Sequence, residues 1–189
     1  MVKVGGEKLS RPKIYRGFDD TQIPDDKYFK ELFRVSVNQI IWGGNYFINH
    51  LQNTPCMIVW DKDNSGNFAD CELAWASFKT SVRMFTYRWN GMLQQNMKNK
   101  EERQHPTQKP IALYKWLLSN YAKPGDKILD THVGSASSLI ACHQMGFEYW
   151  GFELDADYYQ AATERLNKAK AQVDIFEAAD MPKPEQLTI

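Results

Sequence analysis

The stretch "KILDTHVGSASSLIACHQMGFEYWGFELD", residues 127–155, is the part of the sequence that decides the fold. A short apolar run ends at Asp130, a turn with the single glycine Gly134 follows, and a second apolar run ends at Glu153 after a helical pattern. The expected elements are a strand at 127–130, a helix at 137–145, a strand at 148–154 and a helix from about 156 to 172 begun by Asp155. Such alternation predicts an α/β protein with a mostly parallel, doubly wound sheet.

An acidic residue at the end of each of these strands indicates a nucleotide-like cofactor. Glu153 lies 23 residues beyond Asp130, and in Rossmann-like folds an acid at about 20 residues accepts hydrogen bonds from ribose hydroxyls. Dinucleotide sites carry several glycines because the pyrophosphate approaches the backbone closely. S-adenosylmethionine has no phosphate and carries a sulfonium cation, so Gly134 followed by Ser135 and Ala136 suits it better than NAD. An NAD-dependent oxidoreductase is the weaker alternative.

The sequence on either side of this stretch predicts further elements. Apolar spacing in "DDKYFKELFRVS" predicts a helix capped by Asp25 or Asp26, and "ADCELAWASF" fits a helix or a strand equally well. A short buried strand is expected in "NQIIWGG". Two further strands are expected in "CMIVWDK" and "SVRMFTYRW". The polar segment 90–104 is expected to be a long, mobile loop, and Pro110 is expected to open a helix.

Composition bounds the class of protein. The chain has 189 residues, 43% hydrophobic and 24% charged, which predicts a single globular domain over 1–189 with a loose tail at 175–189. No apolar run approaches the roughly 18 residues that a membrane span needs, and the N-terminus lacks a signal-peptide core, so a cytoplasmic location is expected. The spacing of the three cysteines and four histidines does not indicate a metal site.

Charge is unevenly distributed although the formal net charge is zero. The segment 79–109 holds seven Lys or Arg against two Glu, whereas 148–189 holds four against nine Asp or Glu. Both segments can be ordinary solvated faces. The alternative is that the basic segment contacts nucleic-acid phosphates. Its candidate DNA-binding residues are Arg88, Lys98, Lys100 and Arg103.

"HPTQKP" at 105–110, followed by a helix and then by the stretch quoted first, resembles the permuted (β-type) amino-methyltransferases of DNA, especially phage and prophage members. The resemblance implies a Rossmann-like S-adenosylmethionine-dependent methyltransferase fold and a double-stranded DNA substrate. It also implies methylation of an exocyclic amino group, with adenine N6 favoured over cytosine N4, in a restriction-modification or phage context. The family motif usually reads "DPFxGSGTT", and here Thr131 and Ala136 replace its proline and second glycine.

The same resemblance implies which residues contact the cofactor. From the strand-turn motif these are Asp130, Thr131, Gly134, Ser135 and Glu153. From "HPTQKP" they are His105, Pro106, Thr107 and Lys109. "QIIWGGNYF" resembles the strand and turn beside the family's catalytic strand, which adds Gly44 to the cofactor set and makes Asn45 a weak catalytic candidate.

The family's catalytic loop, [DNS]-P-P-[YFW], is absent, because none of the eight prolines is adjacent to another. That loop holds the amine hydrogens and stacks on the flipped base. Its strand normally lies between "KILD" and "QIIWGG", so we expect an N-terminally incomplete fold with unpaired strand edges. The chain is interpreted as a truncated product, as one part of a split enzyme completed by a second copy or a partner chain, or as a non-catalytic remnant that binds cofactor or DNA. We expect residues 1–189 alone to bind S-adenosylmethionine weakly or not at all, and to methylate DNA undetectably.

Overall fold

A computed structural model describes residues 24–64, 69–90 and 93–179. The helices are α1 (Asp26–Val35), α2 (Ile111–Tyr121), α3 (Ser137–Gln144) and α4 (Ala156–Ala179), with short 3₁₀ helices η1 (Gly44–Tyr46) and η2 (Ile48–His50). The strands are β1 (Ile40–Trp42), β2 (Met57–Asp61), β3 (Cys71–Ala76), β4 (Arg83–Thr86), β5 (Trp89–Asn90), β6 (Leu93–Gln94), β7 (Lys127–Asp130) and β8 (Glu148–Gly151). The expected α/β class is confirmed.

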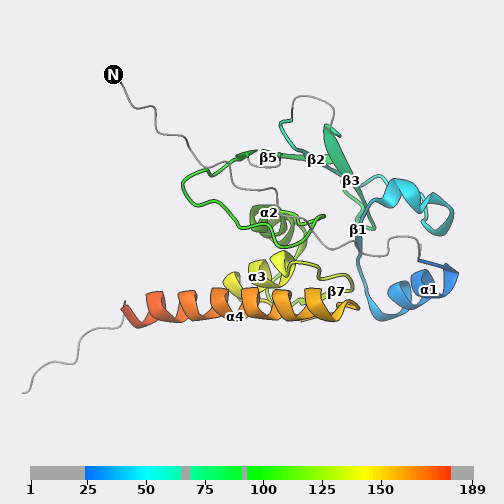
Figure 1. The fold of residues 1–189 in the computed structure, drawn as a ribbon. Coiled ribbons are helices and arrows are strands. Elements are labelled where there is room, and N and C mark those ends of the chain that lie inside the picture. The colour runs from blue at the N-terminus through cyan, green and yellow to red at the C-terminus, as the bar shows by residue number, and fades with distance from the viewer. Residues whose placement is uncertain (1–23, 65–68, 91–92, 180–189) are drawn as a thin grey trace, which may run out of the picture.

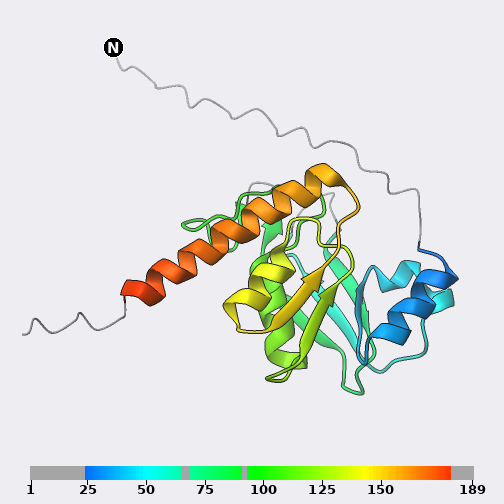
Figure 2. The same ribbon diagram turned by 90° about the horizontal axis from the view of Figure 1, so that it is seen from below.

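The strands form a four-stranded sheet in the order β1-β3-β2-β4 and two separate pairs, β5-β6 and β7-β8. β2 pairs with β4 and β7 pairs with β8 in parallel, whereas β3 is antiparallel to both β1 and β2. The pairing is therefore mixed where a mostly parallel sheet was expected, because β3 returns antiparallel between its two neighbours. Figures 1 and 2 show α1 on one side of the strands and α2 and α3 on the other.

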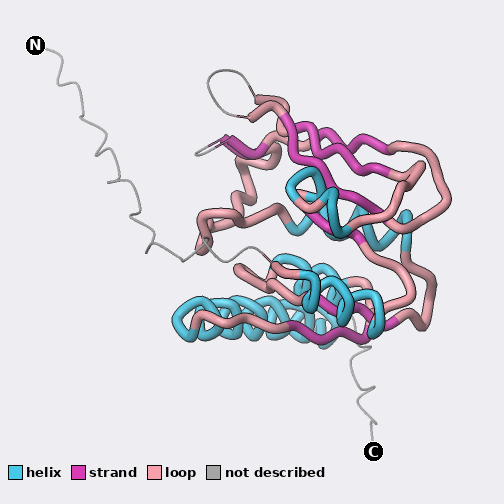
Figure 3. Tube along the Cα trace, turned by 90° about the vertical axis from the view of Figure 1, so that its right-hand side faces the viewer, coloured by secondary structure: helices cyan, strands magenta, loops and turns pink. Residues whose placement is uncertain are grey.

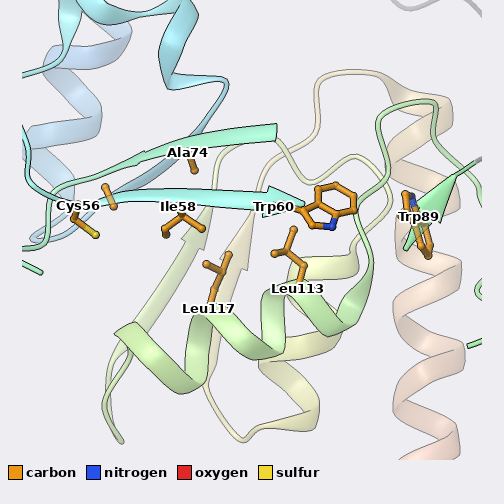
Figure 4. Close-up of a cluster of buried hydrophobic side chains, with 8 residues drawn as sticks. Cys56, Ile58, Trp60, Ala74, Trp89, Leu113 and Leu117 are labelled. Carbon is orange, nitrogen blue, oxygen red and sulfur yellow. The ribbon is translucent and has the colours of Figure 1, made fainter. Parts of the chain in front are cut away.

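The larger core lies between the four-stranded sheet and α2. Ile58 and Trp60 point from β2 toward Leu113 and Leu117 of α2, and all four side chains are buried (Figure 4). The indole N–H of Trp60 donates to the carbonyl oxygen of Tyr87, so this large ring is buried without an unsatisfied polar group.

Within the part of the chain that the structure describes, helices cover one face of the strands β7 and β8. Ile128 and Tyr149 face a core formed with α3, whose buried members include Ala141 and Cys142. Burial raises the pKa of the Cys142 thiol to about 12, so this cysteine is an inert core residue. The tube in Figure 3 shows these two strands and α3 next to the long helix α4, apart from the four-stranded sheet.

The opposite face of β7 and β8 is exposed and apolar. Leu129, Trp150 and Phe152 lie on it, with Phe152 61% exposed. A groove of about 600 Å³ separates this face from α1, and Leu32 and Val35 line its other wall. Among the described strands, β7 pairs only with β8 and β1 only with β3, so each presents a free edge.

Other differences from the expectations are local. The ambiguous segment "ADCELAWASF" contains a strand, β3, because it pairs with β1 and β2 on both sides, where its last three residues are all buried. The expected buried strand β1 is half-buried because it is an edge strand. α4 continues to Ala179, into the tail expected from 175, and residues 180–189 lie outside the described part.

The segment 90–104, expected as a mobile loop, contains β6 and is tied down by its own side chains. Buried Gln94 accepts from the backbone N–H of Glu101 at 2.8 Å and donates to its carbonyl oxygen at 2.8 Å. Within the described ranges, no helix is long and apolar enough to cross a membrane.

Candidate functional site

The turn between β7 and α3 has a backbone conformation that residues with a side chain rarely adopt. Gly134 has φ +53° and Ala136 has φ +62°, both in the left-handed region. Glycine adopts this conformation freely, whereas alanine is strained there. The family motif has glycine at both positions. Ala136 replaces the second glycine here and still adopts the left-handed conformation. Because Gly134 has no side chain, another group can lie close to the backbone of this turn.

The two strand-end acids hold the turn together. Glu153 accepts a hydrogen bond from the backbone N–H of Gly134 at 2.8 Å and another from Asp155 at 3.1 Å. Asp130 accepts from the backbone N–H of His132 at 2.9 Å and from the hydroxyl of Ser138. The sequence-predicted acids therefore meet at one turn, as the parallel pairing of β7 and β8 requires.

His105 is brought to the same place from a segment 29 residues away in sequence. Its ring lies 3.6 Å from where a side chain on Gly134 would begin, and its centroid is 4.3 Å from that of Tyr158 on α4. Its Nδ1 accepts from the backbone N–H of Thr107 at 3.2 Å. Burial lowers the pKa of His105, so near neutral pH the ring is uncharged and carries its proton on Nε2.

Lys109 lies with a different set of residues. Its ammonium pairs with Glu72 of β3 at 3.1 Å and sits 5.4 Å from the centre of the Trp42 ring. Burial raises the pKa of Glu72, but Lys109 and Lys62 outweigh it and hold that pKa below its ordinary value. The lysine thus ties the "HPTQKP" segment to the four-stranded sheet, a structural task that the sequence did not indicate.

Gly44, Asn45 and Thr131 are placed by packing. Gly44 opens η1 and lies so close to Trp75 that an added side-chain carbon would be 2.6 Å from the Cβ atom of Trp75. Asn45, next to it, is exposed. Thr131 shares a 2.8 Å hydrogen bond with the hydroxyl of Tyr28, which joins α1 to the turn after β7. Gly44 and Asn45 therefore belong to the sheet side of the molecule, whereas Thr131 borders the turn.

The candidate DNA-binding residues differ in whether their charged groups contact other parts of the protein. Arg88 forms an ion pair with Asp63, and Arg103 donates to the carbonyl oxygen of Pro106 at 3.0 Å while facing the Trp89 ring. Lys98 and Lys100 are exposed in the segment that follows β6. Two of the four candidate residues, Arg88 and Arg103, thus contact groups of the protein itself.

Three residues at the turn were not predicted. Gly151 allows β8 to approach the turn and α3, since a side-chain carbon there would lie 2.4 Å from Val133 of the turn and 2.9 Å from Leu139 of α3. Tyr158 supplies the ring beside His105, and Arg165 donates to the carbonyl oxygen of Ser135 at 2.6 Å. A glycine within an apolar strand is a signal for Gly151, because glycine there often marks close backbone approach. No local pattern distinguishes Arg165 from other helical arginines.

This turn follows Asp130 at the end of one parallel strand and is held by Glu153, two residues beyond the other, in an arrangement that belongs to a Rossmann-like methyltransferase fold. The chain belongs to the DNA methylase family (N6_N4_Mtase), which matches residues 24–164.

The relatives are similar over parts of their length. The type II methyltransferase M.HpaI of Haemophilus parainfluenzae is 36% identical over 69 residues, which are 36% of this chain and 22% of that protein. A second curated relative, YubD of Escherichia coli (strain K12), is 38% identical over 64 residues, which are 34% of this chain and 28% of that protein. The chain therefore spans less than a third of the curated relatives it matches.

Solved structures support the fold. The M1.HpyAVI–SAM complex matches with a TM-score of 0.55 and 22% identity, covering 76% of this chain and 83% of that one. TTHA0409 of Thermus thermophilus, complexed with S-adenosyl-L-methionine, matches with a TM-score of 0.50 and 19% identity, covering 76% and 75%. At these identities the likeness concerns the fold alone.

Proposed function

We propose that this chain is the cofactor-binding part of an enzyme that transfers a methyl group from S-adenosylmethionine to an exocyclic amino group of a specific DNA site. Adenine N6 is the first target to test, ahead of cytosine N4. The observation that carries the proposal is the convergence of His105, Gly134 and Glu153 at one turn in a chain of the DNA methylase family.

The residues at the turn fit this cofactor. Glu153 uses one hydrogen bond on each carboxylate oxygen within the protein. A carboxylate offers about four acceptor positions, so capacity remains for the ribose hydroxyls. When bound, the cofactor supplies an electrophilic methyl group on a sulfonium sulfur. The uncharged ring of His105 lies beside the open turn without adding a positive charge that would repel this cation.

The cofactor would lie along the open surface of the turn. The cavity between the turn and α4, lined by Glu153, Tyr159 and apolar side chains, measures about 50 Å³. That volume holds roughly one or two water molecules. The much larger groove against α1 touches the turn only at Thr131 and is lined mainly by apolar residues, so we assign it a different role.

We propose that DNA contacts the exposed lysines Lys98 and Lys100, with Arg103 holding the segment in place. Arg88 is assigned a smaller part, because its charge is already paired with Asp63. Phosphate contacts make affinity depend on salt, with log K falling as log[salt] rises in proportion to the contacts. A salt-independent affinity would assign these lysines to an ordinary solvated face.

The free edges of β7 and β1 and the apolar groove favour completion by a further strand. We propose that an extended segment carrying the base-binding loop, from a second copy or a partner chain, pairs along β7 and covers Leu129 and Trp150. A subunit that binds cofactor or DNA without catalysing transfer is the alternative, favoured by the absence of a Pro-Pro loop from the sequence. In both cases, the chain alone is expected to methylate DNA undetectably.

Calorimetric titration tests the cofactor site. S-adenosylmethionine and its demethylated product are titrated into the wild type, Glu153→Gln, Glu153→Ala and the control Glu148→Ala, with NAD as the competing cofactor. Glu148 is an exposed acid of β8 paired with Lys127, so its removal leaves the turn intact. We expect Glu153→Ala to weaken binding by about 1.5–3 kcal/mol, the range for hydrogen bonds to a charged group.

Glu153→Gln keeps an oxygen for Gly134 and separates loss of charge from loss of the turn. Equal affinity in wild type and folded Glu153→Ala would refute the assignment of Glu153, and binding of NAD alone would refute the function. Because the chain alone is expected to bind weakly, the titration is repeated with a chain that carries an upstream strand and a DPPY loop. Methylation of unmethylated duplex DNA by that completed protein, and not by residues 1–189, is the result expected.

A further inference from the structure

A buried ion pair joins the segment 94–109 to the cofactor turn. The Nη2 atom of Arg165, on α4, donates to Glu101 at 2.8 Å, and its Nη1 atom donates to the carbonyl oxygen of Ser135 at 2.6 Å and to the hydroxyl of Ser137 at 2.8 Å. The side chains of Arg165 and Glu101 are only 11% and 19% exposed. Buried charges are tolerated when their hydrogen bonds are satisfied, and here the guanidinium has partners on two different segments.

Glu101 extends the same connection to a third segment. Its second carboxylate oxygen accepts from the backbone N–H of Ile111 at 3.0 Å, at the start of α2. Burial raises the pKa of Glu101 and lowers that of Arg165, so both charges are held where water solvates them poorly. Such a pair depends on both members, because either charge left alone would be buried without compensation.

The segment that Glu101 anchors is cross-linked by its own polar side chains. Gln94 binds both backbone groups of Glu101, and Gln108 accepts from the N–H of Gln104 at 2.8 Å and donates to the carbonyl oxygen of Glu102 at 3.2 Å. His105 lies within this cross-linked stretch. A change at Glu101 is therefore transmitted to the position of His105 over Gly134.

We infer that Arg165 is a positioning residue that holds His105 against the cofactor turn and couples cofactor binding to the order of the segment bearing Lys98 and Lys100. The inference rests on the proposed function, since it assigns a ligand to the turn. Arg165 faces the inner side of the turn through the carbonyl oxygen of Ser135, and so acts through the turn and the segment rather than on the ligand. Cofactor and DNA affinity are linked through the same ion pair.

Trypsin provides a direct readout, because Lys98, Lys100 and Arg103 are cleavage sites within the anchored segment. The variants are Arg165→Met, Arg165→Lys, Glu101→Gln and the double variant Glu101→Gln/Arg165→Met. The matched control is Arg34→Met, which breaks the ion pair with Glu31 on α1 where the two side chains are 66% and 51% exposed. Cleavage rates of residues 1–189 without ligand are followed by mass spectrometry. The completed protein, which carries the upstream strand and the DPPY loop, is used for digestion with S-adenosylhomocysteine and for calorimetry with that ligand.

In Arg165→Met, cleavage after Lys98, Lys100 and Arg103 is expected to accelerate at least tenfold while cleavage at Lys115 in α2 changes less than twofold. Affinity is expected to fall at least tenfold, and ligand protection of the segment should be lost. Arg165→Lys should recover part of both effects, and the double variant should be no worse than Arg165→Met alone. Arg34→Met should behave as wild type.

Equal acceleration at all sites, including Lys115, would mean general destabilisation and would overturn the inference, as would unchanged cleavage at the three sites. Full ligand protection in Arg165→Met would also overturn it. If the wild type of the completed protein binds no S-adenosylhomocysteine, the proposed function fails. The digestion without ligand then still decides whether Arg165 anchors the segment.

Discussion

The four-stranded sheet and the β7-β8 pair use similar side chains but bury them to different extents. Trp60 of β2 is 1% exposed beneath α2, whereas Trp150 of β8 is 46% exposed toward the groove. The four-stranded sheet also receives α1 on its other side, where Phe33 packs edge-on against Trp75. The β7-β8 pair is covered on one face by α3 and α4, and among the described residues it leaves an apolar face and a free edge. The larger buried core thus lies in one region, and the exposed apolar face and the proposed cofactor turn lie in the other.

The turn of the second region is held by polar contacts in addition to the burial of Val133 and Ala136. Glu153 and Asp130 bind backbone N–H groups, and Arg165 binds a backbone carbonyl oxygen. Such contacts define a geometry but bury little apolar surface, which is the main source of folding free energy. The difference shows that the geometry of the proposed cofactor turn is set largely by polar contacts, whereas the first region holds the larger apolar core.

The largest expected effect is the difference in lost stability between substitutions of Trp60 and of Trp150. Trp60→Ala removes a fully buried ring and should lower the free energy of unfolding by about 3–5 kcal/mol. Trp150→Ala removes a half-exposed ring that lies beside Lys127 and should cost less than about 1 kcal/mol. Urea denaturation followed by circular dichroism measures both. Similar losses for the two variants would show that the exposed face is covered in solution.

An intermediate effect concerns pH and His105. Because burial lowers the pKa of His105 below its ordinary value of 6.5, the folded state binds fewer protons there than the unfolded chain does. This contribution to stability is complete above pH 6.5 and is lost as the pH falls below it.

The urea midpoint of the wild type should therefore drop more between pH 7.5 and pH 5.5 than that of His105→Gln. Parallel pH profiles for the two proteins would contradict the burial of a neutral ring at this turn. Trp150→Ala serves as a control, since it should leave the pH profile unchanged.

The smallest expected effect tests the strained turn. Ala136→Gly removes the strain of a left-handed alanine, which costs about 1–2 kcal/mol. It also loses the burial of a methyl group, about 0.8 kcal/mol. The greater backbone entropy of glycine in the unfolded chain costs about 0.5–1 kcal/mol more. These terms nearly cancel, so stability should change by less than about 1 kcal/mol.

The control Ala141→Gly lies in α3 and is also fully buried, and it should cost about 2 kcal/mol from helix propensity and the lost methyl group together. The same urea titration checks both variants. A loss at Ala136 as large as that at Ala141 would show that the strain at this turn is negligible.

Local signals predicted the cofactor half well. The strand at 127–130 has the expected bounds, α3 and β8 begin at the expected residues, and Asp155 caps α4 through the backbone N–H groups of Asp157 and Tyr158. Asp130, Gly134 and Glu153 follow directly from this pattern. Each depends on a few neighbouring residues, so composition and spacing suffice to predict it.

Long-range partners were not predictable in this way. "ADCELAWASF" had equal helix and strand character, and it became β3 because β1 and β2 supply ladders on both sides. Lys109 and Arg88 stay predicted ligand contacts, but their ion pairs with Glu72 and Asp63, which are distant in sequence, were not predicted.

The sequence alone determined the order of strands and helices from Pro110 onward, the glycine turn and its two acids, because these depend on periodicity and on the backbone freedom of single residues. Only the tertiary structure decided that His105 lies over Gly134, that Arg165 meets Glu101 across 64 positions, and that one face of β7 and β8 stays open. The physical reason is that burial and charge pairing depend on which surfaces meet in space, and distant residues meet only after the whole chain has packed.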